Sequence, residues 1–206
     1  IGWSPRRPTR AAQKMPPNYA DMIYESLLRE AYVVRDFGIP AALRVNTDQT
    51  QLVYQQGAGQ TWNLAGETQI SVLGMEEKRA FTLVPGIAAS GDVLPFQAVF
   101  CGKTGGSCPD AKVADCYDEA MALGFRFVTS GKKSNYWSTI DTMKAYVNDI
   151  LVPYFTHKKK ELGLPDHQQS IWRIDCWSVH RSEEFLTWMK TRHPTITVIF
   201  VPGGCT

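Results

Sequence analysis

The sequence predicts a mixed α/β fold: a sheet that begins as an antiparallel meander, continues with parallel strands and is flanked by helices. Two observations lead to this expectation. Between residues 42 and 100, short apolar segments alternate with turn residues, which is typical of strands joined by hairpins. Between residues 171 and 201, strand, helix and strand patterns follow one another, as in a right-handed parallel crossover. The 206 residues, 44% of them hydrophobic, suffice for one ordinary domain with a buried core.

The first 39 residues predict a basic segment followed by a helix. Residues 1–17 carry four basic side chains and no acidic one, and prolines interrupt them, so they predict a linker or the tail of an upstream module. Residues 18–39 predict a connecting helix, because apolar side chains repeat at helical spacing up to Val34 and Gly38 follows as a stop signal.

The meander is expected in residues 42–100. The segment Ala42–Asn46 predicts a strand that places Asp48 just after its end, and a second strand is expected around Leu52. Residues 70–74 and 79–89 also predict extended structure, and a turn at Gly91 leads into a strand over residues 93–100. Residues 102–136 have no clear pattern, so the sequence leaves their structure open.

The last third predicts a buried helix and a crossover. Ser138 resembles a helix cap, the apolar stripe after it predicts a buried helix, and Pro153 is expected to kink or end this helix. The sequence then predicts a strand over residues 171–174, a helix capped by Ser182 and a strand over residues 196–201.

Composition excludes some classes of protein. No segment approaches the ~18 to 20 apolar residues that span a bilayer, so no membrane partner is expected. The five cysteines form no Cys-x-x-Cys pair and match no familiar zinc spacing, so they are interpreted as free thiols. The net charge of +2 does not by itself indicate a polyanionic partner, because a sum over the whole chain hides where the basic residues cluster.

Two acids follow predicted strands and are the candidate metal ligands. Asp48 and Asp175 each come directly after an apolar strand, and ligands collect at the carboxyl ends of parallel strands. If the two strands are neighbours, the carboxylates converge and suit Mg²⁺ or Mn²⁺, which prefer oxygen ligands. The alternative is that each acid opens a turn or caps the next helix. Glu183 and Glu184 are poorly placed as a third ligand, because acids are common at helix starts.

Six segments, in order along the chain, carry a family resemblance. They are Asn46–Thr50, Gly74–Arg79, Leu94–Gln97, Asn135–Thr139, Ile174–His180 and Val201–Thr206. Together they resemble the DDE superfamily endonuclease domain of pogo-like and centromere-protein-B-like transposases of the fungal type. The resemblance extends from about residue 40 to the end, so residues 40–206 are expected to form one catalytic core.

The resemblance implies an RNase H-like fold and a DNA transposase. Asp48 matches the family's first catalytic acid and Asp175 its second, and both are expected to bind Mg²⁺ or Mn²⁺. The family's third acid follows a segment like Val201–Thr206, so we expect it beyond Thr206 and expect the 206-residue chain alone to be inactive. The implied partner is DNA, at transposon ends and at the target, and the implied compartment is the nucleus. Whether the chain forms a homo-oligomer stays open.

Several other side chains are candidates for DNA contacts. Phosphate contacts are expected from basic residues whose other interpretation is ordinary solubility. These residues are Arg6, Arg7, Arg10, Lys78, Arg79 and Lys103. His180 is expected to orient a scissile phosphate or a metal-bound water, or else to cap the following helix.

Two function hypotheses remain. The first is a transposase core that uses a divalent ion to cleave a phosphodiester and transfer the strand. The second is a catalytically silent, transposase-derived DNA-binding or chromatin protein, since a fold persists after its acids become idle.

Overall fold

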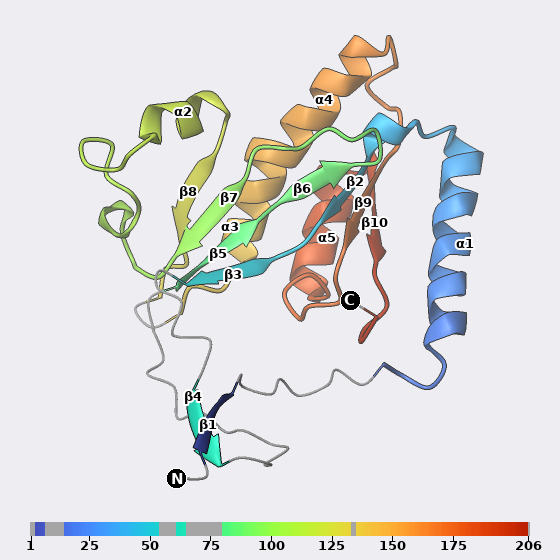
Figure 1. Ribbon diagram of the computed structural model, residues 1–206. Coiled ribbons are helices and arrows are strands. Elements are labelled where there is room, and N and C mark those ends of the chain that lie inside the picture. The colour runs from blue at the N-terminus through green and yellow to red at the C-terminus, as the bar shows by residue number, and fades with distance from the viewer. Residues whose placement is uncertain (1–2, 7–14, 54–60, 65–79, 133–134, 206) are drawn as a thin grey trace.

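A computed structural model describes residues 3–6, 15–53, 61–64, 80–132 and 135–205. Its centre consists of two four-stranded sheets that adjoin each other, with helices packed against them (Figure 1). Both sheets mix parallel and antiparallel neighbours. This arrangement confirms the mixed α/β fold expected from the sequence, with parallel and antiparallel strands and flanking helices.

The first sheet carries the parallel crossover. Its strand order is β10 (Ile196–Phe200), β9 (Ser170–Ile174), β2 (Arg44–Thr47) and β6 (Gly86–Ala88). Strand β9 is parallel to both β10 and β2, and β6 is antiparallel to β2. The predicted crossover is therefore confirmed, and β2 lies at the centre of the sheet between its partners.

The second sheet completes the meander. Its strand order is β3 (Thr50–Val53), β5 (Ala80–Val84), β7 (Gln97–Phe100) and β8 (Arg126–Thr129). The first three strands are antiparallel, and β8 joins β7 in parallel. Strand β8, the short helix α2 (Tyr117–Ala122) and a 3₁₀ turn (Gly105–Ser107) lie in the part of the sequence that had no clear pattern.

The two sheets meet at a break in two strands. Only Asp48 and Gln49 separate β2 from β3, and only Pro85 separates β5 from β6. The Asp48 backbone N–H donates to the Pro85 carbonyl at 3.3 Å and so links the two breaks. The chain therefore changes strand partners at the position of the first candidate metal ligand.

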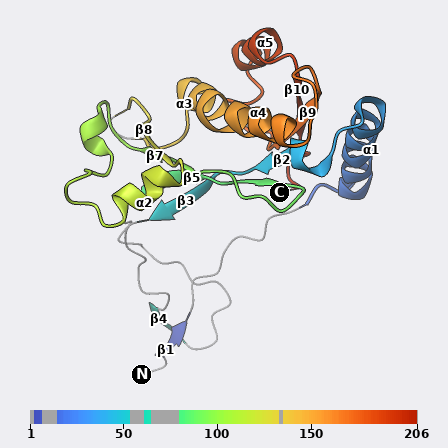
Figure 2. The same cartoon turned by 90° about the horizontal axis from the view of Figure 1, so that it is seen from above.

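One face of the sheets is covered by helices (Figure 2). A long helical segment runs through α3 (Ile140–Tyr146), the π-helical turn η3 (Val147–Leu151) and α4 (Val152–Glu161), and α5 (Glu183–Arg192) lies next to it. The core consists of apolar side chains from these helices and from the first sheet. Its largest fully buried members are Trp172, Tyr146, Phe185, Leu43, Leu94 and Met143.

Two details of this helical segment differ from the sequence prediction. The N-cap is Thr139 rather than Ser138, because Thr139 and Thr142 form the reciprocal hydrogen bonds of a capping box. The helix also continues through Pro153. The wider π-helical turn just before it gives room for a residue that lacks an N–H donor. By contrast, the Ser182 cap of α5 is confirmed, since its side chain accepts from the Phe185 N–H at 3.3 Å.

Helix α1 (Tyr19–Phe37) stands beside β10 at the edge of the first sheet (Figure 1). It ends as predicted at Gly38, which adopts the left-handed conformation. The Ser26 hydroxyl donates to the Phe200 carbonyl at 3.4 Å, and Glu30 forms an ion pair with Arg173 at 3.0 Å. Most of its large apolar side chains are exposed, so polar contacts hold much of this helix in place.

Two further strands pair outside these sheets. Strand β1 (Trp3–Arg6) is antiparallel to β4 (Thr61–Leu64). Part of the segment expected to be a linker is thus paired as a strand. Among the residues that the structure describes, no helix is long and apolar enough to cross a membrane.

Candidate functional site

The two candidate carboxylates directly follow two neighbouring parallel strands. In the parallel pair of β2 and β9, Val45 lies opposite Trp172 and Asn46 opposite Arg173. Strand β2 ends at Thr47 and β9 at Ile174, so Asp48 and Asp175 come directly after adjoining strand ends. Neighbouring strands lie about 4.8 Å apart. The convergence of the two carboxylates stays a prediction.

His180 connects these two strand ends. Its Nδ1 lies 2.7 Å from Asp175 Oδ1, and its Nε2 lies 3.2 Å from the side-chain Nε2 of Gln49. Because an amide nitrogen can only donate, Nε2 accepts, and Nδ1 carries the proton that is donated to Asp175. Gln49, His180 and Asp175 thus form one hydrogen-bonded chain from the break after β2 to the end of β9.

The surroundings of His180 favour its neutral form. The residue is 2% exposed, and its ring packs edge-on against Trp177 at 5.5 Å and near Phe185 at 6.3 Å. Burial lowers the pKa of His180, although the nearby carboxylates of Asp175 and Asp48 act in the opposite direction. A neutral imidazole with one donor and one acceptor matches its two partners.

A buried hydrogen bond fixes the strands just before the site. The indole Nε1 of Trp172 donates to Thr47 Oγ1 at 2.9 Å, and both residues are buried. Thr47 directly precedes Asp48, while Trp172 packs against Tyr146 from the helical layer. This bond couples Thr47, at the end of β2, to Trp172 in the middle of β9, and so fixes the two strands that precede the aspartates.

The two carboxylates fit a divalent ion in part. Oδ1 of Asp48 accepts from the Gln49 N–H at 2.8 Å, and Oδ1 of Asp175 accepts from His180. In each acid the second oxygen has no hydrogen-bond partner within the described ranges, so it is free to act as a ligand. The described residues contain no group of three or more His, Cys, Asp or Glu side chains that could hold a metal. Asp48 and Asp175 thus fit an incomplete oxygen cage of the kind that Mg²⁺ accepts, and they leave room for further ligands.

The other candidate residues are not gathered at this site. Lys103 is exposed in the turn after β7, in the second sheet. Glu184 forms an ion pair with Lys144 at 2.8 Å. The remaining basic candidates, Arg6, Arg7, Arg10, Lys78 and Arg79, lie outside the residues whose side chains the structure describes.

Sequence reasoning gave no role to Gln49, and the structure also shows the contacts of the basic run at residues 158–160. Gln49 is an uncharged neighbour of Asp48, and only its position between two strands could have indicated a role. Lys158 contacts Asp92 at 3.2 Å and Glu161 at 3.0 Å, and the buried Lys159 donates to the Asp166 carbonyl at 3.0 Å. These two lysines therefore stabilise the fold around α4 and are not free to bind phosphate.

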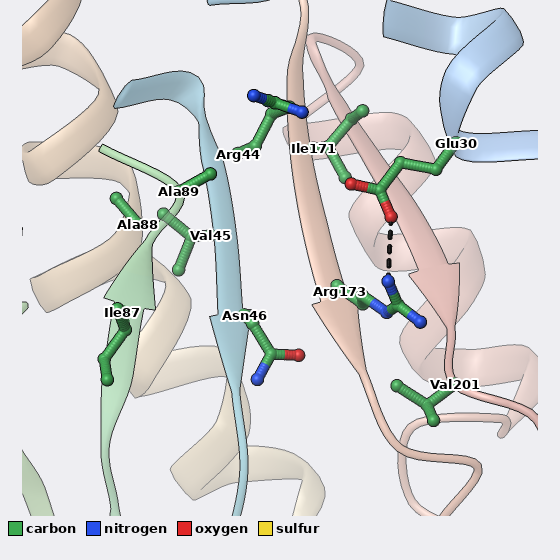
Figure 3. A pocket seen from close by; sticks show the side chains of 10 residues that line it. All are labelled: Glu30, Arg44, Val45, Asn46, Ile87, Ala88, Ala89, Ile171, Arg173 and Val201. Atoms are coloured by element: carbon green, nitrogen blue, oxygen red, sulfur yellow. Dashed lines mark hydrogen bonds and ion pairs between the residues drawn. The ribbon is translucent and has the colours of Figure 1, made fainter. Parts of the chain in front are cut away.

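A hollow of about 540 Å³ lies on the other side of β2 and β9 (Figure 3). Side chains that alternate with the core residues line it, among them Arg44, Asn46 and Arg173. The ion pair between Arg173 and Glu30 closes one side, as the dashed line in Figure 3 shows. This hollow is where α1 meets the sheet, and neither aspartate lines it.

Comparison with known proteins gives a structural likeness only. No protein-family model and no curated protein matches the chain. The structure is similar to that of the Mos1 transposase paired-end complex with left transposon end, at TM-score 0.49 and 8% identity, over 97% of this chain and 47% of that chain. A pre-cleavage Mos1 transpososome has a TM-score of 0.44 and 12% identity, over 97% of this chain and 48% of that chain. The Mos1 strand transfer complex has a TM-score of 0.42 and 10% identity, over 94% of this chain and 44% of that chain. The chain thus spans less than half the length of these transposase chains. Because the TM-scores are below 0.5, we infer function from this chain's own residues.

Proposed function

We propose that this chain forms the metal-dependent, phosphodiester-cleaving core of a DNA transposase of the pogo-like and centromere-protein-B-like type. The observation that carries the proposal is the parallel pairing of β2 and β9, because Asp48 and Asp175 directly follow these two strands. The hydrogen bonds from Gln49 through His180 to Asp175 support the proposal further, because a catalytic carboxylate must be held in a fixed orientation.

The residues of this chain would hold and orient the ion. A Mg²⁺ or Mn²⁺ ion bound between the carboxylates supplies Lewis-acid chemistry, which activates an attacking oxygen and stabilises the leaving one. Asp48 and Asp175 each offer one free oxygen as a ligand. His180 donates to the other Asp175 oxygen and thereby fixes the orientation of the carboxylate. Gln49 fixes the ring of His180 in turn.

The substrate in this proposal is a DNA strand at a transposon end, with the protein acting in the nucleus. The six ordered segments that resemble the transposase family support this choice, because two of them contain Asp48 and Asp175. Two carboxylates are few for two ions, so the proposed centre needs a third acidic ligand besides Asp48 and Asp175.

Binding of Mn²⁺ to the 206-residue chain tests the site directly. Electron paramagnetic resonance of free Mn²⁺ should show that Asp48→Asn and Asp175→Asn each weaken binding at least about tenfold, because each removes one anionic ligand. Asp36→Asn is the matched control, since Asp36 is an exposed acid on α1 that pairs with Arg35. Equal affinity in the wild type and both site variants would rule out these metal ligands.

Cleavage tests the enzymatic part of the proposal. Mn²⁺ should support nicking of plasmid DNA by a form of the protein in which a third acidic ligand completes the site. Either aspartate variant should abolish the nicking. DNA binding by this form without nicking in Mn²⁺ would favour the catalytically silent alternative.

A further inference from the structure

We propose that the groove next to Trp177 accommodates an unpaired nucleotide of the DNA strand whose phosphate lies at Asp48 and Asp175. This inference rests on the proposed function and adds a subsite to it. The groove has a volume of about 900 Å³ and lies between the segment after β8 and the segment after β9. Its lining combines aromatic, hydroxyl and amide side chains, among them Trp137, Trp177, Ser138, Thr139 and Asn135.

Trp137 is a stacking surface held in place by its neighbours. Its side chain is 44% exposed, which is unusual for a residue that could bury a large apolar area. The preceding residue is anchored: the Tyr136 carbonyl accepts from Thr82 at 2.9 Å, and the Tyr136 hydroxyl accepts from Gln51 at 2.6 Å. The Asn135 side chain accepts from the Trp137 N–H at 2.6 Å. An indole presented on a fixed backbone can stack on a nucleobase with little loss of conformational freedom.

Ser138 supplies an unused polar group in the same groove. The residue is 3% exposed, and its hydroxyl has no hydrogen-bond partner within the described part of the chain. A buried hydroxyl without a partner is costly, unless a ligand completes its hydrogen bonding. The same residue is not needed as a helix cap, because Thr139 fills that position. The edge of a base that stacks on Trp137 would provide the missing partner.

The charges of the groove fit a base better than a phosphate. The lining carries Lys132, Asp141 and Glu184, and Glu184 is paired with Lys144 at 2.8 Å. The groove therefore has no excess of positive charge to bind a phosphate, whereas an uncharged base can stack on an aromatic ring and bond to a hydroxyl. A paired duplex cannot offer its base faces for stacking, so the occupant is an unpaired nucleotide.

Trp177 connects the groove to the proposed metal site. Its ring packs against His180 at 5.5 Å, and His180 bonds to Asp175 at 2.7 Å. A strand that places its phosphate at the aspartates therefore has an adjacent subsite for a neighbouring nucleotide.

Binding of a short oligothymidylate, measured by fluorescence anisotropy in EDTA, tests this inference. The wild-type chain should bind the single strand more tightly than a duplex of the same length. Trp137→Ala should weaken single-strand binding at least about fivefold, the lower end for loss of one base stack. Ser138→Ala should weaken it less and leave the melting temperature unchanged, because the Ser138 hydroxyl makes no hydrogen bond with the residues that the structure describes.

Two further variants make the result decisive. Trp137→Phe keeps an aromatic ring, so it should retain affinity while the quenching of tryptophan fluorescence on binding becomes smaller. Tyr24→Ala removes an aromatic side chain that is 64% exposed on α1, and it should bind like the wild type. The inference is overturned if the wild type does not bind the single strand, or if Trp137→Ala binds as tightly as Tyr24→Ala. Because EDTA removes divalent ions, this outcome is independent of whether Asp48 and Asp175 hold a metal.

Discussion

At the scale of single residues, His180 has the largest number of roles in the site. It is buried against Trp177 and Phe185, it donates to Asp175 and it accepts from Gln49. We interpret it as a positioning residue, because both ring nitrogens are used within the protein. The sequence offered two interpretations of His180: it orients a scissile phosphate or a metal-bound water, or it caps the following helix. The cap of α5 is Ser182, and the first interpretation stays a prediction.

Two substitutions separate the packing role of His180 from its positioning role. His180→Ala should lower the free energy of unfolding by about 3 kcal/mol, since it leaves a cavity among aromatic side chains. It should also weaken Mn²⁺ binding. His180→Asn is expected to remain destabilised but to recover most of the Mn²⁺ affinity, because its amide N–H can still donate to Asp175. Denaturant unfolding and Mn²⁺ titration of both variants provide the measurement, and equal Mn²⁺ affinity in the two would contradict a positioning role.

Residue-level contacts were the hardest feature to predict from the sequence. Asp48 and Asp175 could be selected because each follows an apolar strand and carries a charge. Gln49 could not, because its amide is uncharged and its partner His180 is 131 positions away. Likewise Ser138 and Thr139 are adjacent hydroxyl residues with equal capping propensity, and only the geometry of the helix start distinguishes them.

At the scale of elements, strong local signals predicted β9, α5 and β10 to within about one residue. These elements have continuous apolar strands and a serine cap, so local and tertiary preferences agree. Strand β8 was missed, because its four residues follow a segment without pattern and its pairing with β7 comes from distant sequence. The continuation of the helix through Pro153 was also missed, since a π-helical turn has no simple sequence signal.

A partly buried ion pair, between Glu30 and Arg173, helps to hold helix α1 in position. Glu30→Gln should weaken the contact with Arg173 and cost about 1 kcal/mol in α1 docking. Hydrogen exchange of residues 19–37 should therefore become faster, with little change in the melting temperature of the core. Glu25→Gln is the control, because Glu25 pairs with Arg29 in the exposed i,i+4 arrangement. If both variants exchange alike, the ion pair with Arg173 does not hold the helix.

Lys159 gives α4 a pH-dependent stability. Its side chain is 6% exposed, and burial lowers the pKa of this lysine. A lysine whose pKa is lower in the folded state is destabilising while charged, and this cost disappears as the pH rises through the folded pKa towards the unfolded value of about 10.4. Lys159→Met should thus be more stable than the wild type by about 1 kcal/mol at neutral pH.

The difference in stability between Lys159→Met and the wild type should shrink as the pH approaches about 10.4. Urea unfolding between neutral pH and that value measures the trend, with the exposed Lys160→Met as the control. A difference that does not depend on pH would show that the buried charge is not its source.

At the scale of the whole molecule, metal binding should raise the free energy of unfolding and the melting temperature. An ion that binds the folded chain at about a hundred times its dissociation constant adds about 2.7 kcal/mol, which corresponds to a rise in melting temperature of about 5–10 °C for a chain of this size. Mn²⁺ should therefore raise the melting temperature of the wild type and of Asp36→Asn but not of Asp48→Asn.

Without divalent ions, the wild type should no longer be more stable than Asp48→Asn. Asp48→Asn is then expected to be at least as stable as the wild type, because it removes the repulsion between two convergent carboxylates. Differential scanning fluorimetry with and without Mn²⁺ measures both effects. A variant that is stabilised by Mn²⁺ as much as the wild type would be inconsistent with the proposed ligands.

The bond between Thr47 and Trp172 joins residues 125 positions apart, and this separation has a kinetic consequence. Closing so large a loop costs entropy before any contact compensates for it, and topologies with such remote neighbours fold slowly. Helix α5 and its two flanking strands can assemble from adjacent sequence, whereas the pairing of β2 with β9 requires the intervening chain to be in place. The two aspartates would then become neighbours at a late step of folding, and a partly folded chain would carry each acid without its counterpart.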